Sequence, residues 1–303
     1  MRLSLPALLS VAALLSASPC SDAEDARACN IRLHRPRKIG ARTHENFKMT
    51  VENSQRLSSD GRVVKETKEK IEADLSGLNE TVEVSPHGKV QKLKFTVGKS
   101  SVRVNSVPVP DAFNAGAVIS GMLDGKGKPT FSCTDGELAP TAIKILSILF
   151  ELTPDRPNDT NDDIAFGTNQ PRTVGSEWEI NKAETLKSMP PDVPFKLTEN
   201  QISGRVKFPS VKLIAGKEHY LVQAEVTLKP TAMTGLPPNF KLASLKLTAG
   251  MENVVPVDEN AVIPSGKASL WKDITGDLDT PKGKLLMEII ERREKEEQSL
   301  PAD

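Results

Sequence analysis

Four histidines and three cysteines are the residues of this 303-residue chain best suited to bind a metal ion or to act as base and nucleophile. The histidines are His34, His44, His87 and His219. None has a second histidine at the i, i+4 spacing that places two metal ligands on one helix face. A site assembled from residues far apart in sequence stays open as the alternative, but the spacing itself predicts no metal, no cofactor and no catalytic histidine.

Other motifs with a known chemistry are incomplete. The Gly-x-Ser-x-Gly turn that presents the nucleophile of many hydrolases does not occur. The Gly-Lys-Ser sequence at 98–100 resembles the end of a phosphate-binding loop, but Leu93 occupies the place of that motif's first glycine. Asp159, Asn161 and Asp163 alternate as calcium ligands do, without the loop's glycine and closing glutamate. We interpret this run as a polar linker, with a weak surface calcium site as the alternative.

Two of the three cysteines are expected to pair. If Cys20 is removed with a leader, Cys29 and Cys133 remain, and two thiols in an oxidising compartment favour a disulfide. The bond would close a loop of about 100 residues and stabilise the fold by about 4 kcal/mol in the chain-entropy model. Two separate thiols are the alternative, and a metal site made of two cysteines with no nearby histidine is not expected.

The N-terminus has the features of a signal peptide over residues 1–23. Arg2 supplies the positive charge, and residues 3–17 form an apolar stretch that is too short to predict a membrane span. Ser21 and Ala23 are small residues at the positions that precede a cleavage site. We therefore expect an extracytoplasmic mature chain, periplasmic or secreted.

Cleavage after Ala23 would start the mature chain near Glu24. A lipoprotein anchored at Cys20 is the alternative, although Pro19 precedes that cysteine where a small residue is expected. No later run is apolar enough to cross a membrane, so we expect no transmembrane segment in the mature chain.

The composition excludes some partners. Lysine plus arginine and aspartate plus glutamate number 40 each, which gives no net attraction toward nucleic acid or an anionic membrane. Nine phenylalanines, two tryptophans and one tyrosine are too few to suggest stacking platforms for bases. We expect no nucleic-acid partner.

Alternating apolar residues predict strands through most of the chain. Phe47, Met49 and Val51 alternate with polar residues, and the same pattern runs from Tyr220 to Leu228. A first-turn proline and helical spacing predict one helix near residues 140–151. The chain then divides into a first β-rich half (24–154), a polar linker (155–165), a second β-rich half (166–292) and a charged C-terminal tail (293–303).

An internal repeat supports two similar halves. Residues 280–285 match residues 85–90 in residue type and order. Residues 285–297 are helical by propensity, whereas the repeat predicts a strand, which we expect to extend to about Arg292. The fold class is mainly β, with antiparallel strands in two similar halves that form a barrel, half-barrel or wrapped sheet, and one or two short helices.

The stretch 166–178 carries the most distinctive motif. Its pattern is Phe-Gly-x-x-x-Pro-x-x-Val-Gly-x-x-Trp, formed by Phe166, Gly167, Pro171, Val174, Gly175 and Trp178. It resembles a motif of a family of secreted bacterial proteins of unknown function, and no catalytic residue comes with that resemblance. Trp178 is expected to pack against a neighbouring strand, with contact to a ligand as the alternative.

The sequence predicts an exported, non-enzymatic protein and does not define its role. The hypothesis that it favours is the binding of an apolar ligand or an envelope component. The architecture resembles that of bacterial carriers that hold a lipid chain against a curved sheet. The expected ligand surface is the inner sheet face, and the loops around Pro171 and Trp178 are the rival surface. A structural or protein-interaction module, and an enzyme with a dispersed site, stay open. The residues of the expected inner surface, all of which core packing would also explain, are Phe47, Met49, Tyr220, Val222 and Val226.

Overall fold

The computed structural model describes residues 27–155, 161–189, 193–281 and 283–302. The expected signal peptide over residues 1–23, the alternative anchor Cys20 and the calcium-loop residue Asp159 lie outside these ranges.

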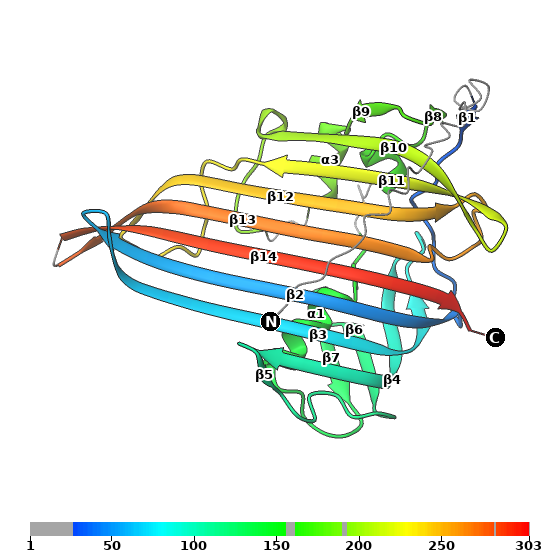
Figure 1. The fold of residues 1–303 in the computed structure, drawn as a ribbon, viewed down its shortest axis with the longest axis horizontal. Coiled ribbons are helices and arrows are strands. Elements are labelled where there is room, and N and C mark those ends of the chain that lie inside the picture. The colour runs from blue at the N-terminus through cyan, green and yellow to red at the C-terminus, as the bar shows by residue number, and fades with distance from the viewer. Residues whose placement is uncertain (1–26, 156–160, 190–192, 282, 303) are drawn as a thin grey trace, which may run out of the picture.

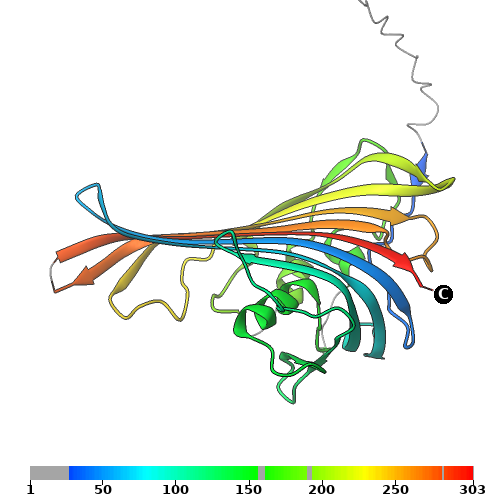
Figure 2. The ribbon, with the colours of Figure 1, turned by 60° about the horizontal axis from the view of Figure 1, so that its bottom comes forward.

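Most of the chain forms one antiparallel sheet of 12 strands (Figure 1). The strand order is β7-β6-β4-β3-β2-β14-β13-β12-β11-β10-β9, and β5 pairs with β4. Among the described residues, the edge strands β7 and β9 do not pair with each other, so the sheet is open and wraps without closing into a barrel (Figure 2). The main strands are β2 (Arg42–Ser59), β3 (Arg62–Val84), β4 (Val90–Val104), β6 (Val118–Leu123), β7 (Pro129–Cys133), β9 (Glu177–Glu179), β10 (Ile202–Ile214), β11 (Lys217–Leu228), β12 (Phe240–Pro256), β13 (Ser265–Thr280) and β14 (Gly283–Pro301).

The short elements lie around this sheet. β5 (Val107–Pro108) extends it, and β1 (Ala28–Cys29) forms a separate two-stranded sheet with β8 (Arg172–Thr173). The helices are α1 (Pro140–Leu149), α2 (Asp162–Ala165), α3 (Lys182–Ser188) and the 3-10 turn η1 (Glu199–Gln201). The expected mainly-β fold class is confirmed, and α1 occupies the range in which a helix was predicted.

Alternation along each strand gives the sheet two different faces. In β2, Phe47, Met49 and Val51 are buried, while the residues between them are not. We call the face that carries these buried residues the inner face and the opposite one the outer face. α1 packs on the inner face through Ala142, Ile145, Leu146 and Leu149.

The inner face carries two hydrophobic cores. The first core is formed by β2, β3, β4, β6 and α1, with Phe95, Phe113 and Phe150 among its aromatic residues. The second core is formed by β10, β11 and β12 together with the N-terminal residues Ile31 and Leu33. Each half of the sequence therefore supplies most of one core, and the central strands join them.

β14 lies in the middle of the sheet, between β13 and β2. The strand expected to extend to about Arg292 is present, but it continues through the predicted charged tail to Pro301, because Arg293 pairs with Val51 and Pro301 pairs with Thr43. Neighbours on both sides bond the backbone, and this tertiary context overrides the helical propensity of a run rich in Glu, Lys and Arg.

The two turn sequences of the repeat are not equivalent positions in space. Residues 85–89 join β3 to β4 beside the start of β2, where Arg42 pairs with Glu80. The turn between β13 and β14 lies at the other end of the sheet, because Leu286 pairs with Ser58. The first half runs outward from the central strand β2, and the second runs inward to β14. The matching residues also flank loops of different length, because Val84 pairs with Val90 whereas Thr280 pairs with Gly283.

The expected linker over residues 155–165 ends in ordered structure. α2 begins after Asn161, whose side chain accepts a hydrogen bond from the Ile164 N–H at 3.0 Å. Asp163 is buried and accepts from Leu33 N at 2.6 Å and from Thr168 Oγ1 at 3.0 Å. Asn161 and Asp163, two of the three residues considered as calcium ligands, thus accept hydrogen bonds from other residues of the chain.

Candidate functional site

Four of the five residues expected to form an apolar ligand surface are buried in the two cores. Phe47 belongs to the first core, and its ring lies 5.4 Å from that of Phe150 in an edge-on contact. Tyr220 belongs to the second core, and its ring lies 5.2 Å from that of Phe208. Core packing accounts for these side chains. Met49 and Val222 are buried in the same way, and Val226 is half-buried.

Cys29 and Cys133 are free thiols, so the expected disulfide is absent from the structure. Cys29 lies in β1 and packs in the second core, whereas Cys133 lies in the edge strand β7 and packs against the first. The two thiols are held apart because they belong to different cores. Cys29 instead neighbours Tyr220, and burial together with this thiol raises the pKa of the Tyr220 hydroxyl to about 12.

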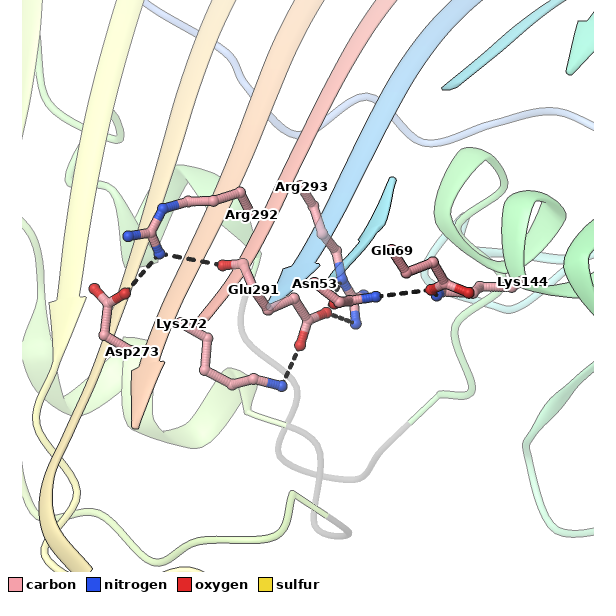
Figure 3. Close-up of polar contacts among 8 residues, drawn as sticks. All are labelled: Asn53, Glu69, Lys144, Lys272, Asp273, Glu291, Arg292 and Arg293. Atoms are coloured by element: carbon pink, nitrogen blue, oxygen red, sulfur yellow. Dashed lines mark hydrogen bonds and ion pairs between the residues drawn. The ribbon is translucent and has the colours of Figure 1, made fainter. Parts of the chain in front are cut away.

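β14 directs charged side chains toward the inner face, between the two cores (Figure 3). Glu291 is buried and pairs with Lys272 of β13 and with Arg293. Burial alone would raise the pKa of Glu291, but the hydrogen bond from Lys272 and the charges of both cations hold it below its ordinary value. The Glu291 carboxylate is therefore charged and paired with two cations.

A second polar group ties α1 to the sheet. Asn53 Nδ2 and Lys144 Nζ both donate to Glu69 Oε2, at 3.1 and 2.8 Å (Figure 3). These hydrogen bonds lower the pKa of Glu69. Each carboxylate in the close-up has its own partners, and these contacts hold neighbouring strands and α1 together.

Glu45 is the most deeply buried acid near the end of β14, with 1% of its surface exposed. Thr43 Oγ1 donates to Glu45 Oε1 at 2.5 Å, and Ser299 Oγ donates to Oε2. Burial, together with the negative charge of Glu297, raises the pKa of Glu45.

In the motif at 166–178, two side chains contact each other and donate hydrogen bonds to the backbone of the same motif. We call this arrangement the brace. Trp178 donates its indole N–H to the Phe166 oxygen at 2.7 Å, and the Arg172 guanidinium lies 4.3 Å from the centre of its ring. Arg172 also donates to the Gly167 oxygen at 2.7 Å. Gly167 has a φ of +67°, and an added Cβ would lie 3.2 Å from Trp178 Nε1, so the turn needs glycine. The packing interpretation of Trp178 fits these contacts.

A hollow with a volume of about 810 Å³ lies on the outer face. Six strands, β9 to β14, line it, but each contributes only a short run of residues, so the hollow crosses the strands as a groove. The five spacings between these six strands, at about 4.8 Å each, make it roughly 24 Å long. We call it the outer groove.

The outer-facing side chains of the outer groove carry an excess of acid. Its carboxylates are Glu177, Glu179, Glu225, Glu252, Glu294 and Glu296, and its outer cations are Lys182, Arg205, Lys207 and Lys267. All four cations are paired within the groove: Arg205 and Lys207 with Glu177, Lys182 with Glu179, and Lys267 with Glu296. Within the described residues, the side chains of Glu225 and Glu294 have no hydrogen-bond or ion-pair partner.

Register explains the floor of the outer groove. Glu225, Gly250, Ser269 and Glu294 pair in succession across β11, β12, β13 and β14. Gly250 and Ser269 leave a low floor between two carboxylates. Sequence reasoning missed this site because outer positions look like ordinary solvated strand faces, and only the strand order brings these four residues into one row.

The four histidines lie in three different places: His34 and His87 beside a second hollow, His44 in β2 and His219 in β11. His34 and His87 line a second hollow of about 600 Å³, where His87 Nδ1 lies 3.1 Å from Asp155 Oδ2. His219 is buried, with Nδ1 2.9 Å from the Lys217 oxygen. No three His, Cys, Asp or Glu side chains of the described chain are grouped as metal ligands would be.

Comparisons with known proteins assign no family. No family model and no curated protein matches this chain. Among solved structures, the crystal structure of MucB in complex with MucA(peri) is 10% identical, and the alignment covers 81% of this chain and 88% of that chain at a TM-score of 0.11. A TM-score this low carries no argument about fold or function. No helix within the described ranges is long and apolar enough to span a membrane.

Proposed function

We propose that this chain is an extracytoplasmic, non-enzymatic module that binds another protein through its outer groove. The observation that carries the proposal is the contrast between the two sheet faces. The inner face is occupied by the two cores and by satisfied ion pairs, whereas the outer face has an open groove lined by charged and small polar residues. A polar groove about 24 Å long suits a polypeptide better than an apolar small molecule.

In-cell photo-crosslinking tests the proposal. A photoreactive amino acid replaces Ser269, on the groove floor, or Thr275, which lies on the same strand and face outside the groove. We expect an adduct of discrete mass in the native host at Ser269, identified as one protein by mass spectrometry, and none at Thr275. Equal labelling at both positions, or no adduct at Ser269, would contradict the proposal.

An apolar-ligand carrier is the alternative function, and the same preparation distinguishes it. Protein purified from the native host is extracted for bound lipids. We expect a clean extract, because the residues first considered for an apolar ligand are packed in the cores. A stoichiometric lipid in the extract would favour the carrier.

The extracytoplasmic location rests on the N-terminal sequence alone. Mass spectrometry of protein from the native envelope should find a chain that starts near Glu24. A mature form that retains Met1 would contradict export, and a lipid-modified Cys20 would favour the lipoprotein alternative.

A further inference from the structure

We infer that the outer groove takes an extended basic segment of its partner, with two cationic side chains four residues apart. This inference rests on the proposed function and adds the chemistry and spacing of the bound segment. It starts from the charge of the groove, where six carboxylates face four cations on the outer side.

The surplus negative charge is concentrated at two points. Each outer cation already has a carboxylate partner in the groove, whereas Glu225 and Glu294 have none within the described residues. Glu252 lies in the next outer row of β12, where its carboxylate accepts a hydrogen bond from the neutral amide of Gln223 at 2.8 Å. A segment with positive charge would therefore supply ion-pair partners for Glu225 and Glu294, and an acidic segment would be repelled.

The distance between these carboxylates sets the spacing of the cations. Glu225 and Glu294 stand in one cross-strand row, three strands apart. Three spacings of about 4.8 Å place them roughly 14 Å apart. An extended chain advances about 3.4 Å per residue and points every second side chain to the same side, so positions i and i+4 are separated by about 14 Å and face the same way.

The floor between the carboxylates accommodates the residue at i+2. Gly250 has no side chain, and an added Cβ there would lie 2.6 Å from Ser269 Oγ. The Ser269 hydroxyl therefore occupies the place that a side chain at Gly250 would take. Because Gly250 and Ser269 are the smallest residues of the row, the floor lies lower there than at the two carboxylates, and the i+2 side chain of the bound segment points toward this part.

Two peptides of identical composition test the spacing. One contains Lys-Thr-Val-Thr-Lys and the other Lys-Thr-Val-Lys-Thr, so that only the first can present both cations on one side. Because a surface charge contact is worth up to about 1 kcal/mol, we expect about fivefold tighter binding of the first peptide by fluorescence anisotropy at low salt. The affinity of the first peptide should fall as salt rises.

Charge-removing variants connect this binding to the groove. Glu225→Gln and Glu294→Gln should each weaken the first peptide by about fivefold and abolish the preference for i, i+4 spacing. Glu72→Gln is the matched control, because Glu72 pairs with Thr50 in the same cross-strand row but lies outside the groove. Urea midpoints of Glu225→Gln and Glu294→Gln should equal that of the unaltered protein, since both side chains are exposed.

Equal affinity for the two peptides, no binding of either, or unchanged affinity in Glu225→Gln and Glu294→Gln would each overturn this inference. If the Ser269 crosslink forms while the peptides fail, the groove binds a protein of different chemistry and the proposed function stands. If the crosslink also fails, both fail together.

Discussion

Lys295 of β14 donates its ammonium to the backbone oxygen of Leu149, the last residue of α1, across 2.8 Å. The same ammonium lies 5.4 Å from the centre of the Phe47 ring. A cation at the C-terminal end of a helix meets the negative end of its dipole and satisfies a carbonyl that has no partner within the helix. One side chain of the central strand thus fixes the helix that closes the first core.

The first prediction follows from this contact. Lys295→Met keeps most of the apolar stem and removes the charge, so the free energy of unfolding should fall by about 1.5 kcal/mol. Urea unfolding followed by circular dichroism measures the change. Lys48→Met, at the exposed outer position of β2 that pairs with Glu296, is the control and should have a midpoint close to that of the parent. Equal effects of the two substitutions would mean that the Lys295 contact contributes nothing.

The second prediction concerns Glu45, whose pKa is raised in the fold. The folded state therefore binds a proton over a pH range in which the unfolded chain, with an ordinary glutamate pKa of about 4.3, has lost it. Protonated Glu45 contributes stability at a pH below the ordinary glutamate pKa, and this contribution is lost as the pH rises through the raised pKa of the folded state. Glu45→Gln should remove this loss, and its stability should fall less between pH 4 and pH 7 than that of the parent.

The third prediction has the opposite sign and concerns Glu291, whose pKa is lowered. Its stability contribution is present above the ordinary glutamate pKa and is lost as the pH falls through the lowered value. Glu291→Gln should destabilise the fold at pH 7 by about 2 kcal/mol, less than for a fully buried pair because Lys272 and Arg293 are partly exposed. Urea unfolding at pH 7 and pH 3 should show the deficit shrinking at the lower pH; a constant deficit would argue against an electrostatic origin.

The fourth prediction tests the brace at 166–178. Trp178→Phe removes the indole N–H and leaves the Phe166 oxygen without that donor, which should cost about 1–2 kcal/mol. Trp271→Phe is the matched control, because Trp271 is 46% exposed on the outer face, and it should change stability far less. Peptide binding in the outer groove should survive in Trp178→Phe, since Trp178 points to the inner side; loss of binding would assign the motif to recognition.

The fifth prediction concerns the thiols. In the structure Cys29 is buried and Cys133 is half-buried, and both are free. A thiol reagent should therefore modify Cys133 first in the folded protein, and both cysteines after unfolding without reductant. The disulfide expected from the sequence would instead leave no reactive thiol in the unfolded, unreduced protein, and this result would require the N-terminal segment to lie elsewhere.

The sequence predicted those features that depend on local pattern. Alternation at Phe47, Met49 and Val51 identified β2, and the proline at 140 marked the start of α1. Pro209, which has no N–H to donate, likewise marks a local irregularity, because the pairing of β10 with β11 shifts between Lys207 and Ser210. Each of these signals lies within a few residues of the feature it predicts.

Features that depend on strand order could not be predicted in this way. Residues 293–301 are so rich in charge that they suggested a tail, yet two neighbouring strands make them a strand. The outer groove has no local signal either, because Glu225, Gly250, Ser269 and Glu294 come from four strands and meet only through register. On the inner face, alternation showed which side chains are buried, but it could not show whether a ligand or the protein's own core covers them.

The position of β14 also governs how the chain can fold. It is the last strand of the sheet in sequence order, and its 19 residues fill the gap between β13 and β2. Until β14 docks, β2 and β13 each present an unpaired edge, the kind of surface at which chains associate wrongly. The pairing of β14 with β2 joins residues more than 200 positions apart, such as Leu286 and Ser58, and contacts of this separation form slowly. The slowest step of folding should therefore be the insertion of this closing strand, which turns two separately nucleated halves into one molecule.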